Sequence, residues 1–157
     1  MIKLSDFNYK VNGADARIVK LDTGTLGIYV YILGYCDNED LDGDAKEIVF
    51  STSASYIPVY INTDCNTISE LKGKTFTKEN SGMFNQYGCA LPINSYELSI
   101  IDINETTITF NWTGKVDTVW MNTKNKPDFE QNIDFSIDYS IDYKIEDIDS
   151  NDIRNYM

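Results

Sequence analysis

The sequence predicts an all-β protein, built as an antiparallel β-sandwich or an open barrel of about eight to nine strands, with one short helix near residues 68–72. Short runs rich in β-branched and aromatic residues alternate apolar and polar positions and are bounded by Asn, Asp and Gly. No long run carries a 3.6-residue apolar period. Since one sheet of this size would leave an apolar face in water, we expect the strands to pack as two layers or to curl into a barrel.

The first predicted strands are 7–11 and 16–21, joined at Asn12 and Gly13. An Asn-Gly pair is what a tight type I′ hairpin turn requires. Residues 26–36, "LGIYVYILGYC", are apolar on both faces. A run of this kind predicts a central strand that is covered on both sides.

The middle of the chain predicts two strands, one helix and one long loop. Strands are expected over 47–53 and 57–61, the second near a sheet edge because Pro58 cannot donate a hydrogen bond. The helix over 68–72 is predicted by a capping-box pattern, Thr67 followed by Glu70, with Gly73 as its left-handed stop. Residues 78–92 form the longest irregular stretch and predict a loop.

The last third of the chain predicts a meander of three strands, at 95–103, 107–113 and 116–121, followed by one long strand over 132–149. Trp112 shares a face with Ile108 and Phe110, which indicates a core position. The polar residues 150–157 are expected to fray.

Length and composition predict one cytoplasmic domain. The 157 residues suffice for a single core spanning 1–157, and no run of about 18 apolar residues predicts a membrane helix. The first ten residues, "MIKLSDFNYK", lack the apolar stretch of a signal peptide. The 25 acidic and 13 basic residues give a formal net charge of −12. This charge disfavours nucleic acid and anionic membranes as partners and favours a basic protein.

The chemistry of the side chains argues against an enzyme and predicts no cofactor. The sequence has no histidine, which excludes Ser-His-Asp and Cys-His-Asp triads, three-histidine zinc sites and a histidine general base within this chain. Phosphate-binding glycine motifs are absent as well. Cys36, Cys65 and Cys89 form neither a disulfide framework nor a zinc motif, so we expect free thiols. An enzyme that uses only carboxylates and tyrosines is the remaining catalytic alternative.

A row of acids distinguishes the strand "NIDFSIDYSIDYKIEDID". Asp134, Asp138 and Asp142 lie on its polar face at intervals of roughly 13 Å, because a strand rises about 3.3 Å per residue. That spacing is too wide for one calcium ion, whose oxygen ligands lie within about 2.6 Å. The row is therefore either solvated surface or a docking face for a cationic partner.

A second acidic group lies in the loop 37–44. It supplies five further candidates for contact with a basic partner: Asp37, Glu39, Asp40, Asp42 and Asp44. Asn38, Asp40 and Asp42 also match the first ligand positions of an EF-hand calcium loop. The match fails at position 12, where Val49 replaces the bidentate Glu, so this is a weak calcium candidate and we expect no metal site.

Two functions from different classes follow. The first is a small acidic protein that neutralises or docks a basic partner such as a toxin, in the manner of an immunity protein or inhibitor, through the two acidic groups. The alternative is a β-sandwich ligand-binding or structural module, carbohydrate-binding or phage-related. In that case we expect Trp120, Tyr87 and Phe84 to bind the ligand.

Overall fold

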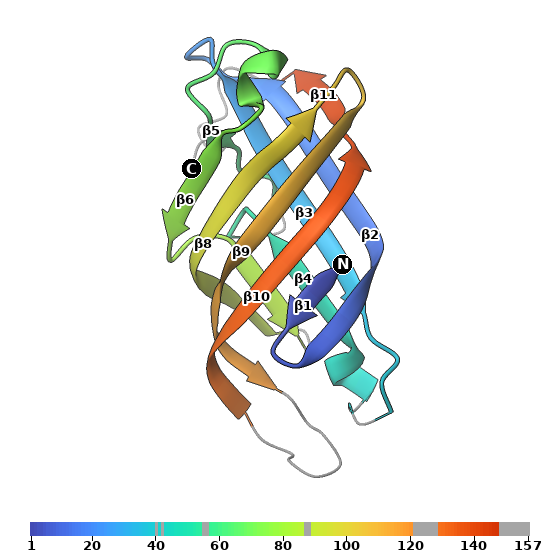
Figure 1. Cartoon of the computed structure of the whole chain (residues 1–157). Coiled ribbons are helices and arrows are strands. Elements are labelled where there is room, and N and C mark those ends of the chain that lie inside the picture. Colours follow the sequence, from blue (N-terminus) through green and yellow to red (C-terminus); the bar gives the residue numbers. More distant parts are fainter. Residues whose placement is uncertain (40, 42, 55–56, 87–88, 121–128, 148–157) are drawn as a thin grey trace.

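The described chain is almost entirely β-structure (Figure 1). The computed structural model describes residues 1–39, 41, 43–54, 57–86, 89–120 and 129–147, with the backbone alone at 44, 120, 129–130 and 147. The strands are β1 (Ile2–Leu4), β2 (Phe7–Lys20), β3 (Leu26–Tyr35), β4 (Glu47–Ser51), β5 (Ile61–Asn62), β6 (Thr75–Glu79), β7 (Met83–Gln86), β8 (Cys89–Ile103), β9 (Thr107–Trp120), β10 (Phe129–Asp142) and β11 (Lys144–Asp147). Two short 3-10 helices, η1 (Gly43–Lys46) and η2 (Ile68–Leu71), accompany them.

Eight strands close into an antiparallel barrel. Their order is β2, β1, β10, β9, β8, β7, β4 and β3, and β3 pairs with β2 again. Three further strands extend it: β5 pairs with β3, β6 pairs with β8, and β11 runs parallel to β2. The all-β prediction is confirmed, and closure removes the exposed edges that an open sheet would present.

The strand predicted over 132–149 is divided in two. Its apolar positions Phe135 and Ile137 face the barrel interior and are buried, as the alternation predicts. After Tyr143 the chain continues as β11, where Ile145 is 66% exposed. β10 pairs with β1, whereas β11 pairs directly with β2, so β1 lies between β10 and β2 along only part of their length (Figure 1).

Aromatic rings fill the barrel around Trp112. The Trp112 ring is fully buried, as predicted, and lies 6.0 Å from Phe50, 5.6 Å from Tyr96 and 5.9 Å from Phe135, measured between ring centroids. All three contacts are edge-to-face, the arrangement that the charge distribution of aromatic rings favours. Within the described residues the indole Nε1 has no hydrogen-bond acceptor. Side chains therefore occupy the interior at this level.

Two predicted turns are wrong. Asn12 and Gly13 lie inside β2, where the register with β3 shifts between Val11 and Gly13, so the pair forms a bulge. A β-carbon on Gly13 would come within 2.8 Å of Leu33 Cδ1. Likewise Gly114 lies inside β9, which is one strand where two were predicted. Both glycines serve close packing between strands, a role with the same local signature as a turn.

The predicted helix at 68–72 is a single 3-10 turn, η2. Glu70 N–H donates to the carbonyl of Thr67 over 3.2 Å, the bond of a 3-10 helix. The Thr67 hydroxyl donates to the Glu70 carboxylate over 3.0 Å and makes no bond to the backbone, so the capping box is incomplete. Gly73 is left-handed, with φ +82°, as expected for the stop.

The predicted loop over 78–92 is also wrong. Most of this stretch belongs to β6, β7 and the start of β8, and β7 is buried along its whole length. Of the strand predicted over 57–61, only Ile61 is included in β5. The predicted frayed tail, 150–157, lies outside the described residues. Neither 3-10 helix has the length or apolar character needed to span a membrane, and the described chain forms no other helix.

Candidate functional site: the outer face of β8, β9 and β10

The acids predicted on β10 form cross-strand pairs with β9. Asp138 lies opposite Asn111 and accepts a 2.7 Å hydrogen bond from its side-chain amide. Asp142 lies opposite Thr107 and accepts a 2.8 Å bond from its hydroxyl. Both donors are neutral, so these bonds fix the two carboxylates in place without compensating their charge.

Asp134 differs from the other two acids. Its carboxylate forms a 2.8 Å ion pair with Lys115, which lies opposite it on β9. Both side chains are exposed, so the pair is screened by water and salt. The row is therefore uneven. Asp134 is ion-paired within the chain, whereas Asp138 and Asp142 form no ion pair with the described residues, and the N-terminal ammonium of Met1 binds the backbone carbonyl of Asp138 at 2.6 Å.

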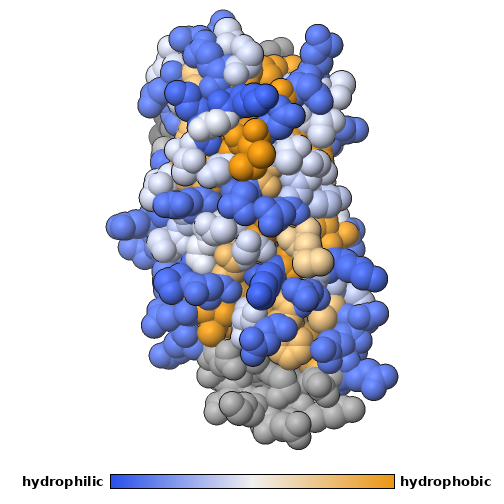
Figure 2. All heavy atoms as spheres, viewed as in Figure 1, coloured by the Kyte–Doolittle hydropathy of each residue, from blue (hydrophilic) through white to orange (hydrophobic). Residues whose placement is uncertain are grey.

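Short polar side chains cover the rest of this face. The hydroxyls of Thr109 and Ser140 are 2.7 Å apart between β9 and β10, and those of Thr75 and Ser99 are 2.9 Å apart between β6 and β8. Figure 2 shows this face as mainly hydrophilic and neutral, with small apolar patches. These cross-strand hydrogen bonds restrict the side chains, so the polar surface is ordered.

The described residues of the loop 37–44 lie at the lower end of the barrel in Figure 1, and β10 runs from that end along the wall. Asp37 and Glu39 are exposed, and Asp40, Asp42 and the Asp44 side chain are outside the described residues. The loop is anchored by buried Leu41. A second anchor is a 3.0 Å hydrogen bond from the Tyr9 hydroxyl to the carbonyl of Ala45. The two predicted acidic groups thus lie on different elements, the loop between β3 and β4 and the strand β10.

The calcium prediction rests on residues of which only Asn38 is described. Asn38 is exposed, and its carbonyl accepts a 3.1 Å bond from Leu41 N–H. Asp40 and Asp42 are not described. Among the described residues, no group of three Asp, Glu or Cys side chains is close enough to hold a metal ion.

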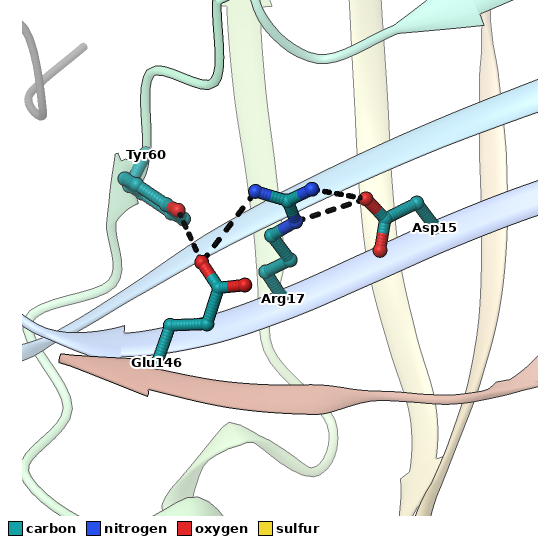
Figure 3. A network of polar contacts seen from close by, with 4 residues as sticks. All are labelled: Asp15, Arg17, Tyr60 and Glu146. Atoms are coloured by element: carbon teal, nitrogen blue, oxygen red, sulfur yellow. Dashed lines mark hydrogen bonds and ion pairs between the residues drawn. The ribbon is translucent and has the colours of Figure 1, made fainter.

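A second polar cluster lies on the outer side of β2. Figure 3 shows Arg17 between Asp15 and Glu146, with the Tyr60 hydroxyl directed at Glu146. Arg17 binds Asp15 at 2.8 Å and Glu146 at 3.5 Å, and Tyr60 donates to Glu146 over 3.4 Å. The Arg17 guanidinium also lies 5.9 Å from the centre of the Tyr29 ring.

The electrostatics of this cluster indicate a structural role. Burial alone would lower the pKa of Arg17, but the hydrogen bond and charge of Asp15, together with the charge of Glu146, raise it. Burial also raises the pKa values of Tyr29 and Tyr60. Two carboxylates compensate the one guanidinium, which leaves no positive charge to attract an anion. The cluster fastens β11 to β2.

The three aromatic residues predicted to bind a ligand do not form a described surface. Phe84 is 1% exposed and packs against Phe50, with ring centroids 5.1 Å apart, so the structure places it in the core. Tyr87 and the Trp120 side chain lie outside the described residues. Cys36 and Cys65 are buried free thiols and Cys89 is an exposed one.

Three residues of this face could not be assigned to the candidate site from the sequence. Asn111, Thr107 and Lys115 each contact a predicted acid, but which one depends on the register between β9 and β10. Lys115 in particular lies between the predicted strands 107–113 and 116–121. The alternation of 107–113 was the available signal, since it places Thr107 and Asn111 on the polar face.

Comparison of the chain with protein-family models, curated proteins and solved structures finds no match.

Proposed function

We propose that this protein is a small acidic binding protein that docks a basic protein partner, as an immunity protein or toxin inhibitor does. The observation that carries the proposal is the exposure of the Asp138 and Asp142 carboxylates and the nature of their hydrogen-bond partners. Each carboxylate is exposed, is held by a neutral donor and forms no ion pair with the described residues; the N-terminal ammonium of Met1 binds only the backbone carbonyl of Asp138. Fixed charges on a rigid sheet bind a complementary surface without first having to be ordered.

The net charge of the chain supports the same proposal. A charge of −12 attracts cationic partners over distances beyond direct contact and accelerates their encounter. The exposed acids of the loop 37–44 add to this field from the end of the barrel. The hydroxyls of Thr109 and Ser140, between the acids of β10, supply hydrogen-bonding groups, so the surface offers hydrogen bonds as well as charge.

The test compares two double charge reversals of equal size. Asp138→Lys with Asp142→Lys changes the proposed face, whereas Asp22→Lys with Glu47→Lys changes two exposed positions outside it, in the turn after β2 and at the start of β4. A fluorescently labelled 12-residue peptide rich in lysine and arginine serves as the basic probe, and anisotropy gives its affinity at low and high salt. We expect the first variant to bind at least about tenfold more weakly at low salt, and the second less than about threefold.

An equal loss in both variants would mean that only total charge matters, and would contradict a docking face on β10. Circular dichroism checks that each variant keeps its β-structure. The same pair of variants then applies to a basic toxin, with inhibition of that toxin as the readout.

A further inference from the structure

A groove crosses the proposed face at the level of Gly114. It has a volume of about 450 Å³. Tyr96, Gly114 and Phe135 form its floor, one from each of β8, β9 and β10, and they lie opposite one another in the sheet. The Tyr96 and Phe135 rings point into the barrel and Gly114 has no side chain, so the backbone is accessible here.

Two rows of outward side chains form the walls. Glu97 and Thr113 lie opposite each other on one side, and Ser95, Lys115 and Asp134 lie on the other. Rows two residues apart along a strand are separated by roughly 7 Å, the width of one extended side chain. A register shift in β8 between Ile93 and Ser95 adds a local irregularity beside the groove.

The charges of the two walls differ. Lys115 compensates Asp134 over 2.8 Å, so that wall is close to neutral. Glu97 is exposed, and its carboxylate makes no ion pair or hydrogen bond to the described residues. The groove thus combines one uncompensated carboxylate, the hydroxyls of Ser95 and Thr113, and a floor without charged groups.

We propose that this groove receives an arginine side chain of the basic partner, with Glu97 as its carboxylate; the inference rests on the proposed function. A planar guanidinium carries five N–H donors, enough for a bidentate pair with Glu97 and for the hydroxyls of Ser95 and Thr113. The methylene groups of the same side chain lie along the floor at Gly114. A lysine ammonium lacks the planar fork and fits this set of acceptors less well.

The probe is the blocked tripeptide acetyl-Gly-Arg-Gly-amide, titrated into the ¹⁵N-labelled protein, with the lysine analogue beside it. We expect saturable shifts of the Gly114, Glu97 and Lys115 amides, and binding of the arginine peptide at least about threefold tighter than that of the lysine peptide. Glu97→Gln should weaken binding at least fivefold. Asp102→Asn, on the same strand and ion-paired with Lys72, is the matched control and should leave it unchanged.

A second variant blocks the groove with a side chain of the protein itself. Thr113→Arg places a guanidinium at the wall and should abolish the shifts at Gly114. Thr109→Arg adds the same charge to the same face four residues away and should leave those shifts in place.

The inference would be overturned if the arginine tripeptide caused no shift of the Gly114 amide signal. It would also be overturned if the Glu97→Gln protein bound this peptide as tightly as the unmodified protein, or if the lysine tripeptide bound as tightly as the arginine tripeptide. The proposed function is tested separately, by the effect of the Asp138 and Asp142 reversals on binding of the 12-residue peptide. If those reversals weaken peptide binding but the tripeptide does not shift the Gly114 amide, the docking face is supported and the arginine site is refuted.

Discussion

Phe135 on β10 lies over Gly114 on β9, where any other residue would place its β-carbon. A β-carbon at Gly114 would come within 2.8 Å of the Phe135 ring and closer still to the carbonyl oxygen of Ser95. The two residues are also direct partners in the β9–β10 register. The interior packing and the groove on the outside therefore depend on the same glycine.

Gly114→Ala should destabilise the protein by about 1–3 kcal/mol, because the added methyl group overpacks a closed site. Urea unfolding followed by circular dichroism measures the change. In a Phe135→Leu background the cost should be smaller, since one of the two obstructing groups is removed. Gly43→Ala, where a β-carbon meets nothing within 4 Å, is the control and should change stability by less than about 0.5 kcal/mol.

Phe50→Ala should cost about 3–5 kcal/mol, the range for loss of a large buried ring. Phe50 is fully buried, and its ring centroid lies 4.6 Å from Phe135, 5.1 Å from Phe84 and 6.0 Å from Trp112. Thermal and urea unfolding measure the loss. A cost no larger than that of Ile101→Ala, at a side chain 55% exposed, would contradict the central place of Phe50 in the core.

The protein should lose stability as the pH rises above about 10. Burial raises the pKa of Tyr96 above its ordinary value, and the buried hydroxyl has no hydrogen-bond partner among the described residues. The unfolded chain then releases the Tyr96 proton first, so the stabilisation present below pH 10 falls by up to about 1.4 kcal/mol per pH unit. Unfolding free energies measured between pH 9 and 11.5 should show a shallower decline in Tyr96→Phe. Tyr35→Phe, at an exposed position, is the control, and an unchanged slope in Tyr96→Phe would refute the assignment.

Glu146→Gln should loosen β11 while leaving the barrel folded. The substitution removes the ion pair with Arg17 and weakens the contact with Tyr60. Exposed pairs contribute up to about 1 kcal/mol, so the amides of 144–147 should exchange with solvent up to about fivefold faster. Hydrogen exchange by NMR resolves this. Asp102→Asn breaks the separate ion pair with Lys72 and should leave β11 exchange unchanged.

The alternation of 132–143 was sufficient to predict β10 and its two faces, because one side of the strand is buried and the other is wet. Gly13 and Gly114 misled the prediction, since a glycine that admits a neighbouring side chain looks the same in sequence as a glycine in a turn. The division at Tyr143 was hidden as well. It follows from the pairing of Lys144 with Arg17, a contact between residues far apart in the sequence.

The candidate site was partly predictable for a similar reason. The row of Asp134, Asp138 and Asp142 is visible in the sequence. Whether each carboxylate has a cationic or a neutral partner depends on another strand, β9. Register is a property of the assembled sheet, and local periodicity contains no record of it. Glu97 belongs to the same surface only because β8 pairs with β9, so it was not a candidate in the sequence.

The pairing of β1 and β11 with β2 has a consequence for the order of folding. Ile2 pairs with Ile137 as well as with Tyr9, so β1 gains its second neighbour only after the chain has been synthesised as far as Ile137. The pairing of β2, β1 and β10 therefore stays incomplete during synthesis. The apolar side of β2 remains exposed until β10 and β11 have been synthesised and have paired. Contacts of such long sequence separation slow folding, and the unfinished barrel is the state in which this protein is most prone to aggregate.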